Sequence, residues 1–344
     1  MRLLVLGGTR FLGRGVVDAA LANGDQVTTF TRGTSGEPPD GVEALHGDRN
    51  RPDGMDVLRG REWDAVIDTS GFVPTVVGRG AALLEDAVGH YVFVSSLNAY
   101  PSFGDEPIRD DTPVHECAPD AGSPDGEFEL EQYGPFKVGS ERAVDQHFAG
   151  RSAHLRAGLI IGPYDDTNRF PYWVDRMARG GEVLAPGRPD VQLRLVDARD
   201  LGAWAVEVAR NRVTGAYVAT GPAGQVTFGG MLAAAAAAAG TSPDVTWVDD
   251  EWLVEQGVAP WSELPLWLPP SAAAYPWDQD TAAAERTGLR TRPIADSARD
   301  TLAWLRAGGS DKAANPRTGK AGLDPDREKE LLAAWRNRGQ RWGG

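Results

Sequence analysis

The chain has 344 residues, a hydrophobic fraction of 41%, a formal net charge of −14 and a sequence pI of about 4.9. This length predicts one large globular domain or two joined ones. The acidity argues against broad contact with a nucleic-acid backbone, which needs clustered Lys and Arg. The single cysteine, Cys117, excludes an intrachain disulfide and fits a reducing cytoplasm.

Neither a signal peptide nor a membrane span is predicted. Met1 runs directly into the first apolar strand, so we expect a cytoplasmic protein. No apolar run approaches the ~20 residues that a spanning helix needs. The longest candidate, 231–239, is rich in alanine and predicts a core helix.

Strand and helix patterns alternate through the first half of the chain. Continuous apolar runs predict strands at 2–6, 26–31, 42–46, 64–68, 91–95 and 154–161. Helices are predicted at 11–22, at 76–88 and around Tyr133. Pro135 fits only the first turn of that last helix, because it has no N–H to donate. This β-α-β rhythm predicts an α/β fold with a parallel sheet covered on both faces.

The second half is less regular. Further strand or helix pieces are predicted near 192–196, 201–210 and 216–220, and a terminal helix at 328–335. Asp197 and Asp200 begin a predicted helix, where capping is their expected role. Residues 103–128 predict a long loop, and the polar, glycine-rich stretch 308–326 predicts a mobile segment.

A glycine-rich turn, Gly7-Gly8-Thr9-Arg10-Phe11-Leu12-Gly13, lies between the first strand and the first helix. This is the context that a dinucleotide-binding fingerprint requires. Gly7 allows the tight turn, Gly13 allows close helix packing, and the helix N-terminus faces a pyrophosphate. Arg10 replaces the usual central glycine, and an ordinary β-α turn is the alternative. The predicted cofactor contacts in this turn are Gly7, Thr9, Arg10, Phe11, Leu12 and Gly13.

The choice of cofactor is predicted from the end of the second strand. An acid there favours NAD, but the chain has Thr31-Arg32. Arg32 and Arg10 can together bind a 2′-phosphate, which favours NADP, with NAD as the alternative. The other explanation is that these arginines are solvated surface charges. Further predicted cofactor contacts are Asp48, at the adenine amino group, and Asp68, Ser70 and Gly71, on the adenosine side.

Ser96, Tyr133 and Lys137 form the predicted catalytic set. Tyr133 and Lys137 are four residues apart on a helix and therefore share a face. A nearby ammonium lowers the pKa of a phenol from its usual value of about 10. Ser96 ends a buried strand, where it can donate a hydrogen bond to the oxygen that Tyr133 protonates or deprotonates. Lys137 can also bind the nicotinamide ribose. The alternatives are a loop-capping serine and a helix-surface Tyr and Lys.

GGTRFLG, VFVSSLNAY and YGPFK, in this order and spacing, resemble the extended short-chain dehydrogenase/reductases, the NAD-dependent epimerase/dehydratase family. The resemblance covers roughly residues 1–220. It implies a doubly wound Rossmann domain at 1–165, with 190–220 returning to it, and a smaller substrate-binding or lid region mainly at 166–344. It also implies the Ser96–Tyr133–Lys137 set and a possible homodimer. The arginine-bearing turn is similar to that of the chloroplast stem-loop-binding proteins, which are associated with RNA.

The chain departs from this family's dehydratases directly after Ser96. Dehydratases carry an Asp-Glu pair there, whereas this chain has Leu97 and Asn98. Neither side chain can act as a general acid, so dehydration is disfavoured.

A second departure concerns charge. Residues 213–285 contain no Lys, Arg or His, but nine acids and five tryptophans. An aromatic, acidic lid favours a neutral or cationic small molecule, although the tryptophans can equally be core and the acids solvated. Arg169, Arg188 and Arg194 lie just upstream and can still form an anion clamp. The predicted substrate contacts are Asn98, Tyr172, Trp173 and Trp261. No His, Cys or Asp cluster has metal-ligand spacing, so we expect no metal.

Three functions follow from the sequence. The first is an NADP-dependent oxidoreductase that transfers hydride between nicotinamide and a small carbonyl or alcohol. The second is an epimerase that acts on one carbon through a transient ketone. The third is a non-catalytic nucleotide- or RNA-associated binding protein on the same fold, which the catalytic set and the negative charge disfavour.

Overall fold

A seven-stranded parallel sheet forms the N-terminal part of the protein in the computed structural model, which describes residues 1–34, 36, 38–109, 111–309 and 321–341. Its strand order is β11-β6-β5-β4-β1-β2-β3. The strands are β1 (Arg2–Leu6), β2 (Gln26–Thr31), β3 (Glu43–His46), β4 (Ala65–Asp68), β5 (Tyr91–Ser96), β6 (Ser152–Ala157) and β11 (Gly215–Ala219). β1 lies between β2 and β4, so the order reverses there, and a ligand crevice is expected at the carboxyl ends of these strands.

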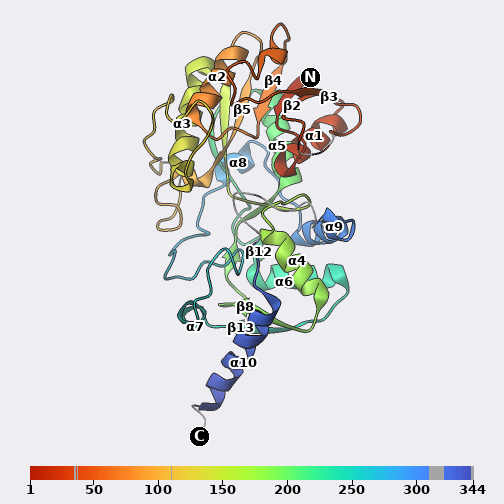
Figure 1. Ribbon diagram of the computed structural model, residues 1–344, viewed down its shortest axis with the longest axis vertical. Helices are drawn as coiled ribbons and strands as arrows, with labels where there is room; N and C mark the ends of the chain where they lie inside the picture. Colours follow the sequence, from red (N-terminus) through yellow and green to blue (C-terminus); the bar gives the residue numbers. More distant parts are fainter. Residues whose placement is uncertain (35, 37, 110, 310–320, 342–344) are drawn as a thin grey trace.

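Helices cover both faces of this sheet, as Figure 1 shows. Alternate β1 side chains point to opposite faces. Leu3 and Val5 pack with α1 (Phe11–Ala22) and α5 (Ala198–Asn211). Leu4 and Leu6 lie in a second core with α2 (Pro74–Leu84) and α3 (Tyr133–Phe148). The predicted doubly wound parallel α/β fold is therefore confirmed.

A smaller C-terminal region lies at the other end of the molecule, with α10 pointing away from the sheet (Figure 1). It contains a separate core built on the parallel pair β8 (Glu182–Pro186) and β13 (Asp244–Val248). Its helices are α4 (Arg169–Arg179), α6 (Phe228–Ala239), α7 (Asp250–Glu255), α9 (Ile294–Arg306) and α10 (Pro325–Arg341). Short elements complete the described chain: β7 (Leu159–Ile161), β9 (Gln192–Leu193), β10 (Leu195–Asp197), β12 (Val226–Thr227), α8 (Ala282–Arg286), and the 3-10 helices η1 (Asp56–Leu58), η2 (Leu97–Ala99) and η3 (Leu130–Gln132).

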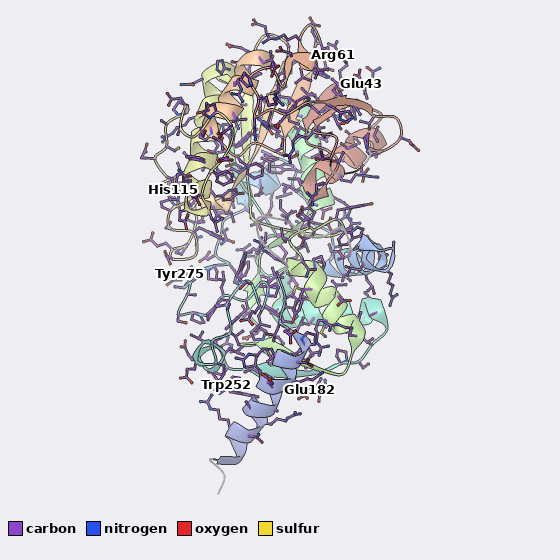
Figure 2. The ribbon with its side chains drawn as sticks, viewed as in Figure 1. Glu43, Arg61, His115, Glu182, Trp252 and Tyr275 are labelled. Atoms are coloured by element: carbon purple, nitrogen blue, oxygen red, sulfur yellow. The ribbon has the colours of Figure 1, made fainter. Side chains whose placement is uncertain are left out.

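The terminal helix α10 is fixed to this region by an aromatic contact and an ion pair. The Trp252 and Trp335 rings meet edge to face, with centroids 5.1 Å apart. Arg336 pairs with Glu182 at 2.8 Å. Figure 2 shows Trp252 and Glu182 at this end of the molecule, far from His115 beside the sheet. No described helix is long and apolar enough to cross a membrane.

Two predicted elements have different bounds in the structure. The strand expected at 154–161 is two strands, because β6 stays in the main sheet whereas β7 pairs with β10. Gly158 lies between them, and its N–H donates to Ala219 O at 2.9 Å. The helix expected at 76–88 begins at Pro74 and ends at Leu84. Proline favours the first helical position because its missing N–H has no partner there in any case.

The segment 308–326, predicted to be mobile, is described in part. Residues 310–320 lie outside the described part of the chain. Beyond them, Gly322 N–H donates to Ser262 O at 2.7 Å, Leu323 is buried, and Pro325 begins α10. The prediction is therefore wrong for residues 321–326, because an apolar anchor and a backbone hydrogen bond hold them.

Candidate active site

The glycine turn after β1 is closed by direct backbone packing. Gly7 has φ +110°, which favours glycine, and a Cβ on Gly13 would lie 2.5 Å from Gly8 N. Arg10 is the N-cap of α1 but makes no side-chain cap bond, and the first turn of α1 contains no acid. The helix N-terminus therefore presents N–H groups and its positive dipole without a competing carboxylate. These features fit a dinucleotide pyrophosphate.

The two arginines predicted to bind a 2′-phosphate are in different situations. Arg10 pairs with Asp166 at 2.9 Å, so it is already neutralised by the chain itself. Arg32 follows β2, is exposed, and forms no ion pair within the described ranges. The geometry therefore leaves Arg32 alone available to a phosphate, and the predicted two-arginine site is not assembled.

A buried ion pair that the sequence analysis missed occupies the end of β4. Arg49 donates to both carboxylate oxygens of Asp68, at 2.8 and 2.9 Å, and both residues are buried. The Tyr91 hydroxyl also donates to Asp68, at 2.9 Å. The neighbouring Arg49 holds the pKa of Asp68 below its usual value, although burial alone would raise it. The Asp68 carboxylate is therefore occupied by Arg49 and Tyr91. Contrary to the prediction, it is not exposed on the adenosine side of the crevice.

Two other predicted cofactor residues lie near this pair. Ser70 Oγ donates to Leu6 O at 3.1 Å and accepts from Arg49 at 3.1 Å. Asp48 is half-buried and accepts the Asn50 N–H at 3.1 Å. The structure thus brings the β1 and β4 ends together with the loop after β3. An arginine directly after Asp48 was the only sequence signal for the ion pair.

Lys137 is buried under the first turn of α3. Its Nζ donates to Gly71 O at 2.7 Å and to Val94 O at 2.9 Å. It also lies 5.0 Å from the centre of the Phe72 ring and 4.9 Å from that of Phe93. Burial lowers the pKa of Lys137 to about 8. The lysine is therefore an ammonium at neutral pH that can lose its proton under mildly alkaline conditions.

Tyr133 is the first residue of α3, and its ring lies 5.7 Å from Lys137 Nζ. Phe72 and Phe128 contact it, each with a centroid separation of 6.4 Å. Ser96 ends β5 and caps η2, where its Oγ accepts the Asn98 N–H at 3.1 Å. The elements that carry the three predicted catalytic residues thus meet at the carboxyl edge of the sheet.

Arg169 joins this site from the first position of α4. Burial lowers the pKa of Arg169 and outweighs the nearby Asp165 and Tyr133, which tend to raise it. The guanidinium lies 5.0 Å from the centre of the Trp261 ring, a cation–π distance. Trp261 has φ +67° and stacks on Trp277 with centroids 6.5 Å apart. From the sequence, Arg169 was only one of three candidates for an anion clamp.

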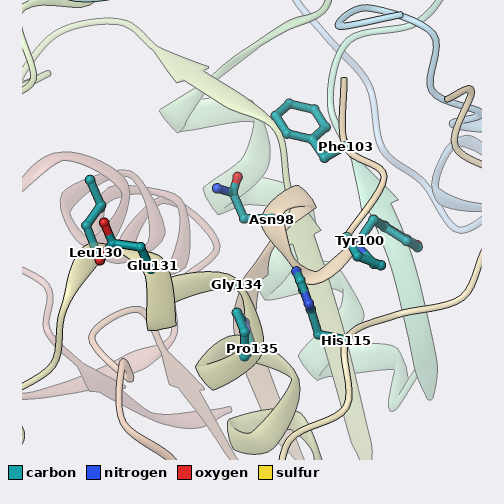
Figure 3. Close-up of a pocket in the computed structure, with 9 residues that line it drawn as sticks. Asn98, Tyr100, Phe103, His115, Leu130, Glu131, Gly134 and Pro135 are labelled. Atoms are coloured by element: carbon teal, nitrogen blue, oxygen red, sulfur yellow. The ribbon is translucent and has the colours of Figure 1, made fainter. Parts of the chain in front are cut away.

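A polar pocket of about 250 Å³ lies beside the start of α3 (Figure 3). Asn98, from η2, and Gly134 and Pro135, from α3, contribute to its wall. His115 and Phe103 close other sides, from the long loop after β5. Ser96 and Tyr133 are not among its lining residues, so the pocket adjoins the predicted chemistry without containing it.

Two predicted substrate residues belong to the C-terminal core instead. Trp173 is fully buried and its indole donates to Pro265 O at 2.6 Å. Tyr172 is 7% exposed and packs against Trp173 and Gly322. The aromatic residues of helix α4 point into the core because its Phe170–Val174 stretch is continuously buried. The expectation that Tyr172 and Trp173 reach the cleft is therefore corrected.

Residues 3–219 of the chain match the sequence profile of the NAD dependent epimerase/dehydratase family. The chain belongs to this family. It is therefore an enzyme of the extended short-chain dehydrogenase/reductase type, and the match covers every strand of the main sheet. A search of curated proteins finds no significant match. Among the described residues, no group of three or more His, Cys, Asp or Glu side chains could hold a metal ion.

Solved enzyme structures share the fold over nearly the whole chain. The Bordetella bronchiseptica enzyme WbmH, in complex with NAD+, is 16% identical with a TM-score of 0.65, and the match covers 90% of this chain and 99% of that one. The Thermus thermophilus UDP-glucose 4-epimerase complex with NAD is 20% identical, with a TM-score of 0.61 and coverage of 89% and 99%. The Bacillus cereus UDP-glucuronic acid 4-epimerase, also with NAD, is 14% identical, with a TM-score of 0.62 and coverage of 90% and 100%.

Proposed function

We propose that this enzyme is a nicotinamide-dinucleotide-dependent epimerase that inverts one carbinol carbon of a sugar-like substrate through a transient ketone. The observation that carries the proposal is the buried Lys137 ammonium beside Tyr133 at the carboxyl edge of the sheet. The 4-epimerases of similar fold support this reading over net reduction, which the sequence alone favoured. Leu97 and Asn98 follow Ser96, so no acid is placed there to eliminate water.

Each residue has a definite task in this reaction. Tyr133 takes the proton of the substrate hydroxyl and later returns it, and Lys137 favours the phenolate that does so. Ser96 donates a hydrogen bond to the same oxygen as it becomes a carbonyl. The Gly7–Gly13 turn and the N-terminus of α1 hold the pyrophosphate. A bound nicotinamide dinucleotide would supply the hydride acceptor and donor that oxidation of the carbinol carbon and reduction of the ketone from its opposite face require.

The substrate that this geometry favours carries an anionic group. Arg169 is partly buried on the Trp261 ring, within electrostatic reach of Tyr133. Of the two acids nearest in sequence, Asp165 is buried and accepts hydrogen bonds from Thr167, and Asp166 is paired with Arg10. A carboxylate or phosphate would offset the cost of keeping a guanidinium partly out of water. Arg169 therefore weighs against the neutral or cationic substrate that the acidic segment 213–285 suggested.

A reductase that uses NADPH is the second candidate. It is favoured by Arg32, whose exposed guanidinium at the end of β2 suits a 2′-phosphate. Two further expectations from the sequence also remain proposals. One is a domain boundary near residue 165, and the other is a homodimer.

Mass spectrometry of the purified protein and product analysis separate the two functions. An epimerase is expected to retain NAD and to interconvert sugar epimers, tested with UDP-glucose, UDP-galactose and their uronates, without added reductant. Stoichiometric consumption of NADPH with a reduced product would replace the epimerase by the reductase. An Arg32→Gln variant should then lose its preference for NADPH, with the exposed, ion-paired Arg188→Gln as control.

A further inference from the structure

The Arg49–Asp68 ion pair lies behind the catalytic lysine and has no role in the reaction described so far. It is bidentate, with both N···O distances below 3 Å. Asp68 is 0% exposed and Arg49 9% exposed, so water does not screen the pair. Burial raises the pKa of Tyr91 well above its usual value, so its hydroxyl stays a neutral donor to Asp68. The carboxylate is thus held from two sides in a dry environment.

Asp68 fixes the turn that holds Lys137. Its Oδ1 accepts the Ser70 N–H at 3.0 Å. Its Oδ2 would lie 3.0 Å from a Cβ on Gly71, so the carboxylate packs directly against that glycine. The Gly71 carbonyl is the closer of the two acceptors of Lys137 Nζ. A continuous chain of contacts therefore runs from Arg49 through Asp68 and Gly71 to Lys137.

The same turn is tied to the cofactor side of the crevice. Thr69 Oγ1 and Ser70 Oγ both donate to Leu6 O, at 3.0 and 3.1 Å. A Cβ on Gly7 would lie 2.3 Å from Thr69 Oγ1, so the glycine turn and residues 68–71 are in direct contact. The ion pair therefore buttresses a junction between the predicted pyrophosphate site and the lysine.

Charged groups on several elements shift the pKa of Lys137. Besides burial, Asp68 raises its pKa, Arg49 lowers it and Glu141 raises it, in that order of size. Glu141 is itself paired with Arg156 at 2.7 Å. Tyr133 lies one helical turn from Lys137. The groups facing the lysine or bound to those that do are Arg49, Asp68, Tyr91, Tyr133, Glu141, His154 and Arg156. Asp68 and Arg49 act on the lysine with opposite signs, and the effect of Asp68 is the larger.

We propose that Arg49 is a positioning residue for Lys137: through Asp68 it fixes the Gly71 carbonyl and balances the carboxylate's charge, so that the lysine's charge state depends on this pair. The inference rests on the proposed role of Lys137, but its test requires no turnover. A failed search for epimerase activity would leave this test intact, and a failed titration would leave the reaction assignment intact.

The lysine content of the chain makes the titration direct. The chain has four lysines: Lys137, Lys312, Lys320 and Lys329. Protein labelled with ε-13C lysine should give four side-chain signals, and Lys137→Met identifies the one of interest. The titration midpoint of this signal is measured in the wild type and in variants of the ion pair.

The two single variants should shift the midpoint in opposite directions. Arg49→Met leaves the carboxylate uncompensated and should raise it by about one unit or more. Asp68→Asn leaves the guanidinium uncompensated and should lower it by a similar amount. Arg176→Met and Glu328→Gln, which break a buried pair of the same chemistry in the C-terminal region, should leave it unchanged.

A purely structural ion pair predicts a different pattern. Loosening the turn would admit water around Lys137 and move the midpoint upward in both single variants. That result, or no shift in Asp68→Asn, would overturn the proposal. If Arg49→Met does not fold, Asp68→Asn decides alone, because a downward shift has no structural explanation and an upward shift or none contradicts the charge balance.

Discussion

Arg176 in the C-terminal region and Lys137 in the sheet region are both buried cations, but their charges are compensated differently. In the C-terminal region, Arg176 meets both oxygens of Glu328, at 2.8 and 3.0 Å, and donates to the Gly180 and Glu182 carbonyls. In the sheet region, the Nζ of Lys137 is bound by two neutral carbonyls. A closed ion pair fixes structure, whereas an incompletely compensated charge is available for chemistry. The difference separates the scaffold from the candidate active site.

The largest expected effect comes from removing the phenol at that site. Tyr133→Phe should lower turnover by about 10²- to 10⁴-fold, the scale of lost general acid–base catalysis. Cofactor binding should stay nearly unchanged, because the glycine turn and Arg32 are untouched. Epimer interconversion and cofactor titration measure the two properties separately. Undiminished turnover would remove Tyr133 from the mechanism.

Breaking the closed pair should change stability and leave chemistry alone. Arg176→Met strands a buried Glu328 and should cost about 3–5 kcal/mol of unfolding free energy. Denaturant unfolding measures this cost. The paired replacement Arg176→Met with Glu328→Leu should recover most of it, because no charge is then left unpaired. A large loss of turnover at temperatures where the variant is folded would contradict the contrast between the two cations.

The incompletely compensated lysine should make stability depend on pH. The folded pKa of Lys137 is about 8, below the ~10.4 of an unfolded lysine. Between these values the unfolded state binds more protons, so stability rises with pH, by about 3 kcal/mol over the whole window. Lys137→Met should lack this rise. Unfolding free energies of both proteins at pH 8 and pH 10 give the difference, and parallel curves would show that the lysine titrates normally.

The smallest predicted effect concerns substrate affinity. Arg169→Gln should raise KM about tenfold for an anionic substrate and little for its neutral analogue. Arg188→Gln is the matched control, because that arginine is exposed and paired with Asp190. Equal changes in KM for charged and neutral substrates would contradict an anionic substrate. They would favour the neutral or cationic molecule that the acidic segment 213–285 predicted.

The local patterns of the sequence predicted the sheet well. The bounds of β1, α1 and β2 match the predicted ranges, because period, glycine turn and buried apolar runs agree there. The family assignment from the three motifs is confirmed. Asp197, expected to cap a helix, is the N-cap of α5 and accepts the Arg199 N–H.

Long-range pairings could not be predicted in the same way. The Arg49–Asp68 ion pair joins the loop after β3 to the end of β4, and no local pattern shows which acid an arginine will meet. The ion pair between Arg10 and Asp166 could not be predicted for the same reason. Tyr172 and Trp173 were misplaced because aromatic residues suit a core and a cleft equally well. Helix α4 turns them inward, and that orientation depends on the packing of the whole C-terminal region.

The position of β11 has a consequence for synthesis of the chain. β11 is an edge strand of the sheet, but residues 215–219 follow β6 by more than fifty positions. While the chain emerges from the ribosome, β6 must wait with its outer backbone groups unpaired. A nascent chain that stalls before β11 exposes this unpaired edge to strand addition by another chain. Aggregation is therefore most expected after β6 is synthesised and before β11 pairs with it.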